Sequence, residues 1–120
     1  MKRILVIDDE LETRTVIELI LSENNFVVET LSRSQYLTYS IEFFKPELIL
    51  LDVGLEGADG RELCNSLKTS KKTSHIPVIL FSGYPNLSEH LNGCQPDAII
   101  EKPVDLVKLL EIIKQTLHEV

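Results

Sequence analysis

The strongest constraint on the fold is a regular alternation between short apolar runs and longer segments whose apolar residues recur at helical spacing. The runs are rich in branched residues and predict buried strands at residues 4–7, 26–28, 48–51, 78–81 and 98–100. The helical spacing predicts helices at residues 11–23, 35–44, 61–68 and 105–118. Strands that are apolar throughout need cover on both faces, so the pattern predicts an α/β fold with a doubly wound sheet of five parallel strands.

The segment between the fourth and fifth strands departs from this alternation. Residues 84–96 are interrupted by proline and glycine, and only Leu87 and Leu91 indicate one or two helical turns. We therefore expect the fourth helix to be short or irregular.

Length and charge narrow the function classes. A chain of 120 residues has room for one hydrophobic core, so we expect a single domain over residues 1–120. A chain with a net charge of −7 lacks the excess of basic residues needed to bind the phosphates of nucleic acids, so we expect no direct binding to nucleic acid. Without an apolar run of about 18 residues or a signal-peptide pattern, we expect a cytoplasmic protein that does not enter a membrane. The two cysteines form no disulfide framework: we place Cys64 in the core and Cys94 in a loop where it can be exposed.

Polar side chains follow the ends of four predicted strands. Asp8 and Asp9 follow the first strand, Asp52 the third, Ser82 the fourth and Lys102 the fifth. Open α/β sheets bind ligands beyond the carboxyl ends of the strands, where the strand order reverses. If the order is 2-1-3-4-5, the first and third strands flank that reversal and the three aspartates converge there. Three carboxylates and one ammonium leave a charge of −2, which one divalent cation would neutralise, and all-oxygen ligands favour Mg²⁺.

Each of these residues also has an ordinary structural explanation. Asp9 can be the N-cap of the first helix, and Asp52 can belong to a turn. Residues 82–83 can form a simple turn, and Lys102 can be a solvated surface lysine. We expect Asp59–Gly60 to be structural, as a cap and turn before the third helix. The coincidence of the others at neighbouring strand ends favours the functional explanation.

Five short motifs, each in the same order and place relative to the strands, resemble those of the receiver domain of two-component response regulators. They are Asp8-Asp9, Asp52, Asp59-Gly60, Ser82-Gly83 and Lys102-Pro103. The resemblance covers essentially the whole chain and implies the flavodoxin-like receiver fold, here of the single-domain type.

The resemblance implies that Asp52 is the phosphoacceptor, taking a phosphoryl group from the phosphohistidine of a sensor histidine kinase or phosphotransfer protein, or from a small donor. Ser82 would turn toward the new phosphate, Lys102 would pair with it, and the Lys102–Pro103 bond would be cis. Such a domain assists its own phosphorylation and the hydrolysis of its own aspartyl phosphate, and we do not expect this chain to be a metabolic enzyme.

The resemblance also implies the ligands of the Mg²⁺ ion. Asp9 and Asp52 would bind the metal directly, together with the backbone carbonyl of Gly54, and Asp8 would reach it through water. In this family the surface that responds to phosphorylation combines the fourth helix, the fifth strand and the last helix. We expect it to contact an unknown downstream protein, with a homodimer through the same face as a further possibility.

The sequence departs from the family pattern at several positions. Ile99 stands where the family usually has the aromatic residue that swings inward on activation, Glu56 replaces a common proline, and Gly83 a common alanine. These changes support an alternative, a degenerate receiver that acts as an unphosphorylated protein-interaction module. An Asp-nucleophile phosphohydrolase is disfavoured because Gly54 stands where that superfamily has a second aspartate.

Overall fold

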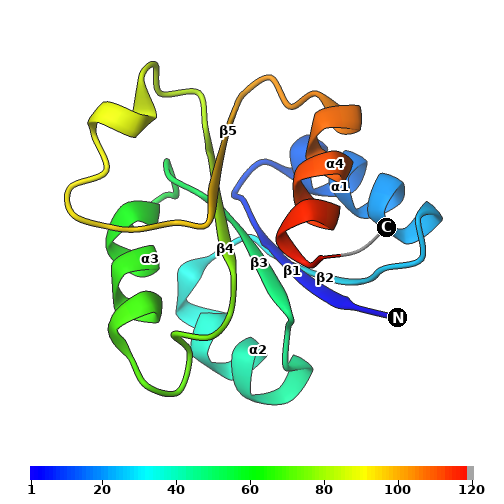
Figure 1. The fold of residues 1–120 in the computed structure, drawn as a ribbon, viewed down its shortest axis with the longest axis horizontal. Coiled ribbons are helices and arrows are strands. Elements are labelled where there is room, and N and C mark those ends of the chain that lie inside the picture. The colour runs from blue at the N-terminus through cyan, green and yellow to red at the C-terminus, as the bar shows by residue number, and fades with distance from the viewer. Residues whose placement is uncertain (119–120) are drawn as a thin grey trace.

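The computed structural model describes residues 1–118 and confirms the predicted architecture. Five parallel strands form one sheet in the order β2-β1-β3-β4-β5 (Figure 1). Their bounds are β1 (Arg3–Ile7), β2 (Val27–Leu31), β3 (Leu48–Asp52), β4 (Val78–Ser82) and β5 (Ala98–Glu101). The reversal of strand order falls between β1 and β3, so the carboxyl ends of these two strands flank the position where such sheets bind ligands.

The helices cover both faces of the sheet (Figure 1). Helices α1 (Leu11–Glu23) and α4 (Leu106–Thr116) pack on one face, and α2 (Leu37–Phe44) and α3 (Gly60–Thr69) pack on the other. Two short 3₁₀ helices, η1 (Ser34–Tyr36) and η2 (Leu87–Glu89), complete the described elements. None of the helices in the described part of the chain is long and apolar enough to cross a bilayer.

The apolar strand runs are explained by their burial. Every residue of β3 and β4 is buried, and so is every residue of β1 after Arg3, because these three strands form the centre of a sheet covered on both faces. Strand β2 lies at an edge and is only partly buried, so hydrophobicity marks its ends poorly. The predicted strand at residues 26–28 is wrong in its bounds: Phe26 is a core residue before the strand, and β2 runs on through Glu29 and Thr30.

The predicted helix at residues 11–23 has the observed bounds, and the others differ at their ends. The segment predicted as one helix at residues 35–44 is divided into η1 and α2, α3 is one residue longer at each end than predicted, and α4 is shorter than the predicted 105–118. Two side chains take over the free backbone N–H groups at helix starts. Asp59 accepts from the N–H of Arg61, and Asp105 accepts from the N–H groups of Val107 and Lys108.

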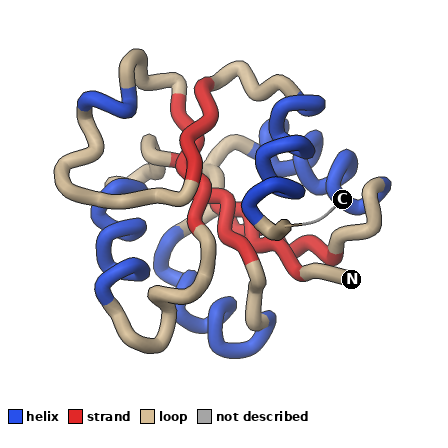
Figure 2. The backbone as a smooth tube through the Cα atoms, in the orientation of Figure 1, coloured by secondary structure: helices blue, strands red, loops and turns tan. Residues whose placement is uncertain are grey.

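The connection from β4 to β5 contains no α-helix, and the helix labelled α4 is the last one, which follows β5. Within residues 83–97, the only regular element is η2, which appears as a single short turn in the long loop of Figure 2. Asn86, Asn92 and Gly93 adopt left-handed backbone conformations, which break up any helix there. The expectation of a short or irregular fourth helix is therefore confirmed.

Two side chains anchor this connection in the core. Leu87 and Cys94 are buried against the α3 side of the sheet, in the same cluster as Cys64. The exposure expected for Cys94 is wrong, because the loop turns back onto the sheet after Gly93. Burial, aided by the neighbouring Cys94 thiol, raises the pKa of the Cys64 thiol to about 12. Both sulfurs are free and fill the core as small apolar groups.

Candidate functional site at the carboxyl ends of the strands

Three aspartates meet at the carboxyl edge of β1 and β3. Asp8 follows β1, Asp52 is the last residue of β3, and Asp9 lies beside them at the start of the β1–α1 loop. Each offers a carboxylate oxygen, and these oxygens all lie within 4.8 Å of one another. Asp8 is fully buried and Asp52 is 4% exposed, whereas Asp9 is exposed. The predicted convergence of the three carboxylates is therefore present in the structure.

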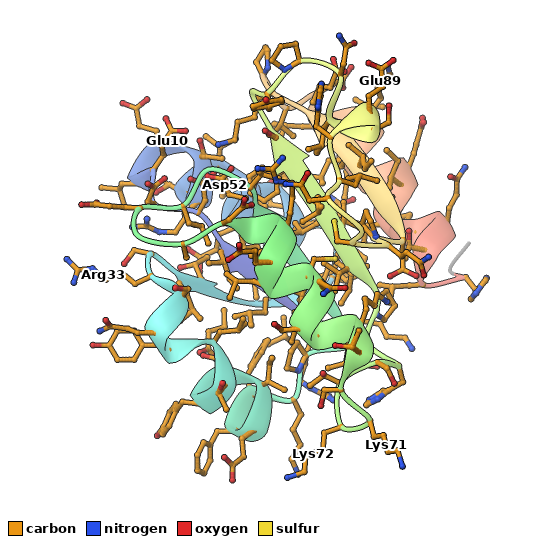
Figure 3. All side chains as sticks on the ribbon, turned by 90° about the vertical axis from the view of Figure 1, so that its left-hand side faces the viewer. Glu10, Arg33, Asp52, Lys71, Lys72 and Glu89 are labelled. Atoms are coloured by element: carbon orange, nitrogen blue, oxygen red, sulfur yellow. The ribbon has the colours of Figure 1, made fainter. Side chains whose placement is uncertain are left out.

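Lys102 supplies the positive charge of this cluster from the end of β5. Its Nζ lies 3.0 Å from Asp8 Oδ2 and 3.4 Å from Asp52 Oδ2. The same Nζ lies 3.1 Å from Oε1 of Glu10, an exposed carboxylate that was not among the predicted site residues. The uninterrupted acidic run at residues 8–10 was the signal for this fourth carboxylate. Glu10 and Asp52 lie at one end of the molecule, and Lys71 and Lys72 lie at the other (Figure 3).

Burial and like charge perturb the ionisation of this cluster. Burial, followed by the neighbouring Asp8 carboxylate, raises the pKa of Asp52 to about 6, and the Lys102 ammonium opposes this shift. Burial works against the charge on Lys102, but hydrogen bonds to Asp8 and Glu10 outweigh it and raise the pKa of Lys102. Lys102 is therefore firmly cationic, while Asp52 holds its negative charge at a cost.

The donor set fits a hard dication. Asp8 Oδ2 is buried and, within residues 1–118, is approached by the Lys102 ammonium at 3.0 Å but has no well-aligned hydrogen-bond donor, so it retains capacity for a further positive partner. Asp8, Asp9 and Asp52 provide only oxygen ligands, which Mg²⁺ prefers. Gly54 lies two residues after Asp52, and its N–H donates to Asp52 Oδ1 at 3.2 Å, which orients the carboxylate.

Ser82 and Lys102 leave adjacent strands side by side. Ser82 is buried at the end of β4, and its carbonyl accepts a hydrogen bond from the Lys102 N–H at 2.8 Å. The Ser82 Oγ accepts from the N–H of Tyr84 at 2.8 Å, so the hydroxyl does take part in a turn, as the structural alternative expected. The Lys102–Pro103 peptide bond is cis, the isomer that the family resemblance implied.

The remaining sequence expectations are placed as follows. Asp9 is not the N-cap of the first helix: Glu10 holds that position, and its N–H donates to Asp8 Oδ1. Ile99 is half-buried and packs on the core of the α2–α3 face, as expected of an aliphatic residue there. Glu56 and Gly83 are exposed in loops at this end of the strands.

Comparison with known families decides the identity of the fold and its site. The family described as Response regulator receiver domain matches residues 4–114 of this chain. The chain belongs to this family. The resemblance inferred from five short motifs is therefore confirmed, and the acidic cluster occupies the carboxyl edge of a receiver domain.

Curated relatives share this domain as part of longer proteins. Response regulator PleD of Caulobacter vibrioides is 31% identical over 114 residues, which are 93% of this chain and 25% of that protein. The phosphate regulon transcriptional regulatory protein PhoB of Pseudomonas aeruginosa is 31% identical over 119 residues, covering 98% of this chain and 52% of that protein. This receiver domain thus spans about a quarter to a half of the length of these relatives.

Solved structures agree with the fold throughout the chain. A response regulator receiver domain protein (CheY-like) from Methanospirillum hungatei JF-1 has a TM-score of 0.87 and 31% identity, covering 98% of this chain and 94% of that one. The signal receiver domain of a signal transduction histidine kinase from Syntrophus aciditrophicus has a TM-score of 0.89 and 28% identity, with coverage of 98% and 91%.

Proposed function

We propose that this receiver domain is phosphorylated on Asp52, that the reaction depends on Mg²⁺, and that the modification switches binding to a partner protein. One observation carries the proposal: the Lys102 ammonium lies against two buried carboxylates, 3.4 Å from Asp52 Oδ2 and 3.0 Å from Asp8 Oδ2. We further propose that residues 1–120 act as one such domain. Receiver domains are in general signalling modules and not metabolic enzymes.

In the proposed reaction, a carboxylate oxygen of Asp52 attacks the phosphorus of a phosphohistidine. The new oxygen–phosphorus bond forms as the nitrogen–phosphorus bond breaks, and the electron pair of that bond returns to the imidazole nitrogen. With a small acyl phosphate donor, the leaving group is the carboxylate. The product in both cases is a mixed anhydride on Asp52.

Residues around Asp52 meet the charge that this reaction brings. A bound Mg²⁺, held by Asp8, Asp9, Asp52 and the Gly54 carbonyl, would supply charge neutralisation between the carboxylates and the incoming phosphoryl oxygens. The Lys102 ammonium, already 3.4 Å from Asp52 Oδ2, would pair with a phosphoryl oxygen. The Ser82 hydroxyl would donate a hydrogen bond to another phosphoryl oxygen. The Gly54 N–H keeps the other side of the acceptor carboxylate oriented.

The groove beside Lys102 is suited to the phosphohistidine-bearing partner. It lies between α1 and the β5–α4 loop, has a volume of about 540 Å³, and is lined by Glu10, Val16, Lys102 and Pro103 among others. Because Glu10 and Lys102 also belong to the acidic cluster, the groove is continuous with the acceptor site. The helices α1 and α4 also carry four exposed apolar side chains, Leu11, Val16, Leu19 and Val107. We propose that a helical segment of a histidine kinase or phosphotransfer protein packs there.

Phosphorylation is tested by intact-mass measurement after incubation with Mg²⁺ and acetyl phosphate. We expect the wild-type protein to gain one phosphoryl group, and Asp52→Asn, or wild type with a chelator, to gain none. A well-folded wild-type protein that stays unmodified, under conditions that label a control receiver domain, would overturn the proposal. That result would favour the degenerate, unphosphorylated interaction module.

A further inference from the structure

Arg61 ties the loop between β4 and β5 to the start of α3. Its Nη1 donates to the carbonyl of His90 at 2.7 Å, across 29 residues of sequence. The other two guanidinium nitrogens donate to the Asp59 carboxylate, Nη2 to Oδ2 at 2.8 Å and Nε to Oδ1 at 3.0 Å. Because Asp59 is also the N-cap of α3, one planar side chain joins the first turn of this helix to the loop.

The Arg61 side chain also contacts the aromatic residue that follows the switch hydroxyl. Its guanidinium carbon lies 5.7 Å from the centre of the Tyr84 ring, within the range of a cation–π contact. The Tyr84 ring in turn meets the His90 ring edge-on, with ring centres 5.5 Å apart. Arg61, Tyr84 and His90 therefore form one contact cluster, which we call the Arg61 clamp.

The Arg61 clamp is joined to the acceptor site through Ser82. The Tyr84 N–H donates to Ser82 Oγ at 2.8 Å, and Ser82 is buried at the end of β4. If Ser82 Oγ rotates toward a phosphoryl group on Asp52, it moves away from the Tyr84 N–H. The Tyr84 N–H then loses its acceptor unless its backbone follows, and a shift of this backbone carries the ring that contacts Arg61.

The rest of the loop has little packing against the core. It has no α-helix within residues 83–97, and apart from the buried Leu87 and Cys94 most of its side chains are exposed. Ile99, at the position of the missing aromatic switch, offers an aliphatic side chain with no ring to rotate. The described contacts thus lead from Ser82 to α3 through Arg61, and position 99 lies outside this route.

We propose that Arg61 is a positioning residue that couples phosphorylation of Asp52 to the first turn of α3. In this protein the N-terminal end of α3, together with the loop at residues 83–92, is then the surface that changes for a partner. The inference rests on the proposed phosphorylation of Asp52, and it adds a route and an output surface to that function.

Hydrogen exchange tests the coupling. Wild type, Arg61→Ala, Arg61→Lys and the control Asn65→Ala are compared with and without Mg²⁺ and excess acetyl phosphate, and intact mass is measured on the same samples. Asn65 is exposed on α3 and lies outside the clamp. In wild type and Asn65→Ala, we expect phosphorylation to raise the exchange rate severalfold both at residues 83–92 and at residues 60–64.

The Arg61 variants separate the two responses. In Arg61→Ala we expect phosphorylation to the same extent and a continued response of residues 83–92, but no response at residues 60–64. Arg61→Lys should behave in the same way, because an ammonium cannot make the planar, forked contacts. A normal response at residues 60–64 in Arg61→Ala, or none in phosphorylated wild type, would overturn the coupling. An unmodified mass in wild type would overturn the proposed function itself.

Discussion

Gly60 packs directly against the backbone of Asp52, so that a Cβ at Gly60 would lie 2.2 Å from the Asp52 carbonyl oxygen. The same Cβ would lie 2.7 Å from the Cα of Val53. The Gly60 N–H also donates to the Val53 carbonyl at 2.9 Å. Glycine is therefore required here by close approach of two backbone segments, and the start of α3 fixes the chain that carries the proposed phosphoacceptor.

Gly60→Ala is expected to destabilise the protein by roughly 1–3 kcal/mol, because rigid backbone atoms have to move to admit the new methyl group. Urea unfolding measures the loss. Gly83→Ala is the matched control, since a Cβ there would meet nothing within 4 Å and the stability should hardly change. Equal midpoints for the two variants would show that the Gly60 contact relaxes without cost.

Asp52→Asn is expected to stabilise the metal-free protein at neutral pH. The pKa of Asp52 is raised from an ordinary 3.8 to about 6, so the folded state binds the extra proton between these values. Stability therefore falls as pH rises through this window, and the full cost of the charge is present above it. This difference between the folded and unfolded pKa of Asp52 corresponds to at most about 3 kcal/mol.

This stabilisation has a defined pH dependence and a control. In urea unfolding with a chelator, the free energy of unfolding of Asp52→Asn should exceed that of wild type at about pH 7.5 and match it near pH 4. Added Mg²⁺ should raise the stability of wild type and shrink the difference. Asp59→Asn should behave in the opposite way, because Arg61 lowers the pKa of Asp59. The charged Asp59 stabilises the fold above its unfolded pKa and this stabilisation is lost as pH falls, so the variant should be less stable than wild type at neutral pH. A wild type more stable than Asp52→Asn at neutral pH would contradict the burial argument.

The lesson for sequence interpretation differs between the strands and the loops. Uninterrupted apolar runs located β1, β3 and β4 correctly, because only strands in a sheet covered on both faces are apolar throughout. Once the strand order was fixed, the positions of Asp8, Asp52 and Lys102 after their strands followed, since parallel strands end at one edge. The acidic cluster was therefore predictable from local pattern together with topology.

Contacts between distant loops were not predictable in this way. Arg61 resembles any charged residue in the first turn of a helix, and its bond to the His90 carbonyl depends on the path of a loop with no periodic pattern. The predictions for the exposure of Cys94 and for the end of β2 were wrong for the same reason, because tertiary packing determines both. The importance of Gly60 was predicted only as turn chemistry, because close approach to Asp52 leaves no trace in the local sequence.

Lys102→Met is expected to destabilise the metal-free protein at neutral pH by about 3 kcal/mol, because it leaves two buried carboxylates without their cation. Asp52→Asn in the same chain should recover much of this loss by removing one of the two charges. Lys108→Met, at an exposed position on α4, is the control and should have little effect. If Lys102→Met unfolds at the same urea concentration as wild type, the ammonium is not what holds this cluster together.

Tyr84→Ala and Gly54→Asn are expected to change the lifetime of the aspartyl phosphate in opposite directions. Tyr84 follows Ser82 by two residues, and in the unphosphorylated structure its ring contacts Arg61 and His90. Truncating the ring opens a path for water, so hydrolysis should be severalfold faster. Gly54 has open space where a side chain would go, and an asparagine there would occupy part of the approach to Asp52, so hydrolysis should be slower.

The decay is followed by intact mass after the phosphodonor is removed, with Mg²⁺ present throughout. Tyr39→Ala is the control, because Tyr39 is an exposed aromatic residue on α2 that stacks on Phe43 away from the acceptor site. Hydrolysis by water attack at phosphorus depends on which side chains border the aspartyl phosphate, whereas a general loss of stability would affect Tyr39→Ala as well. Decay rates for Tyr84→Ala and Gly54→Asn that equal those of wild type would show that neither position screens the phosphoryl group.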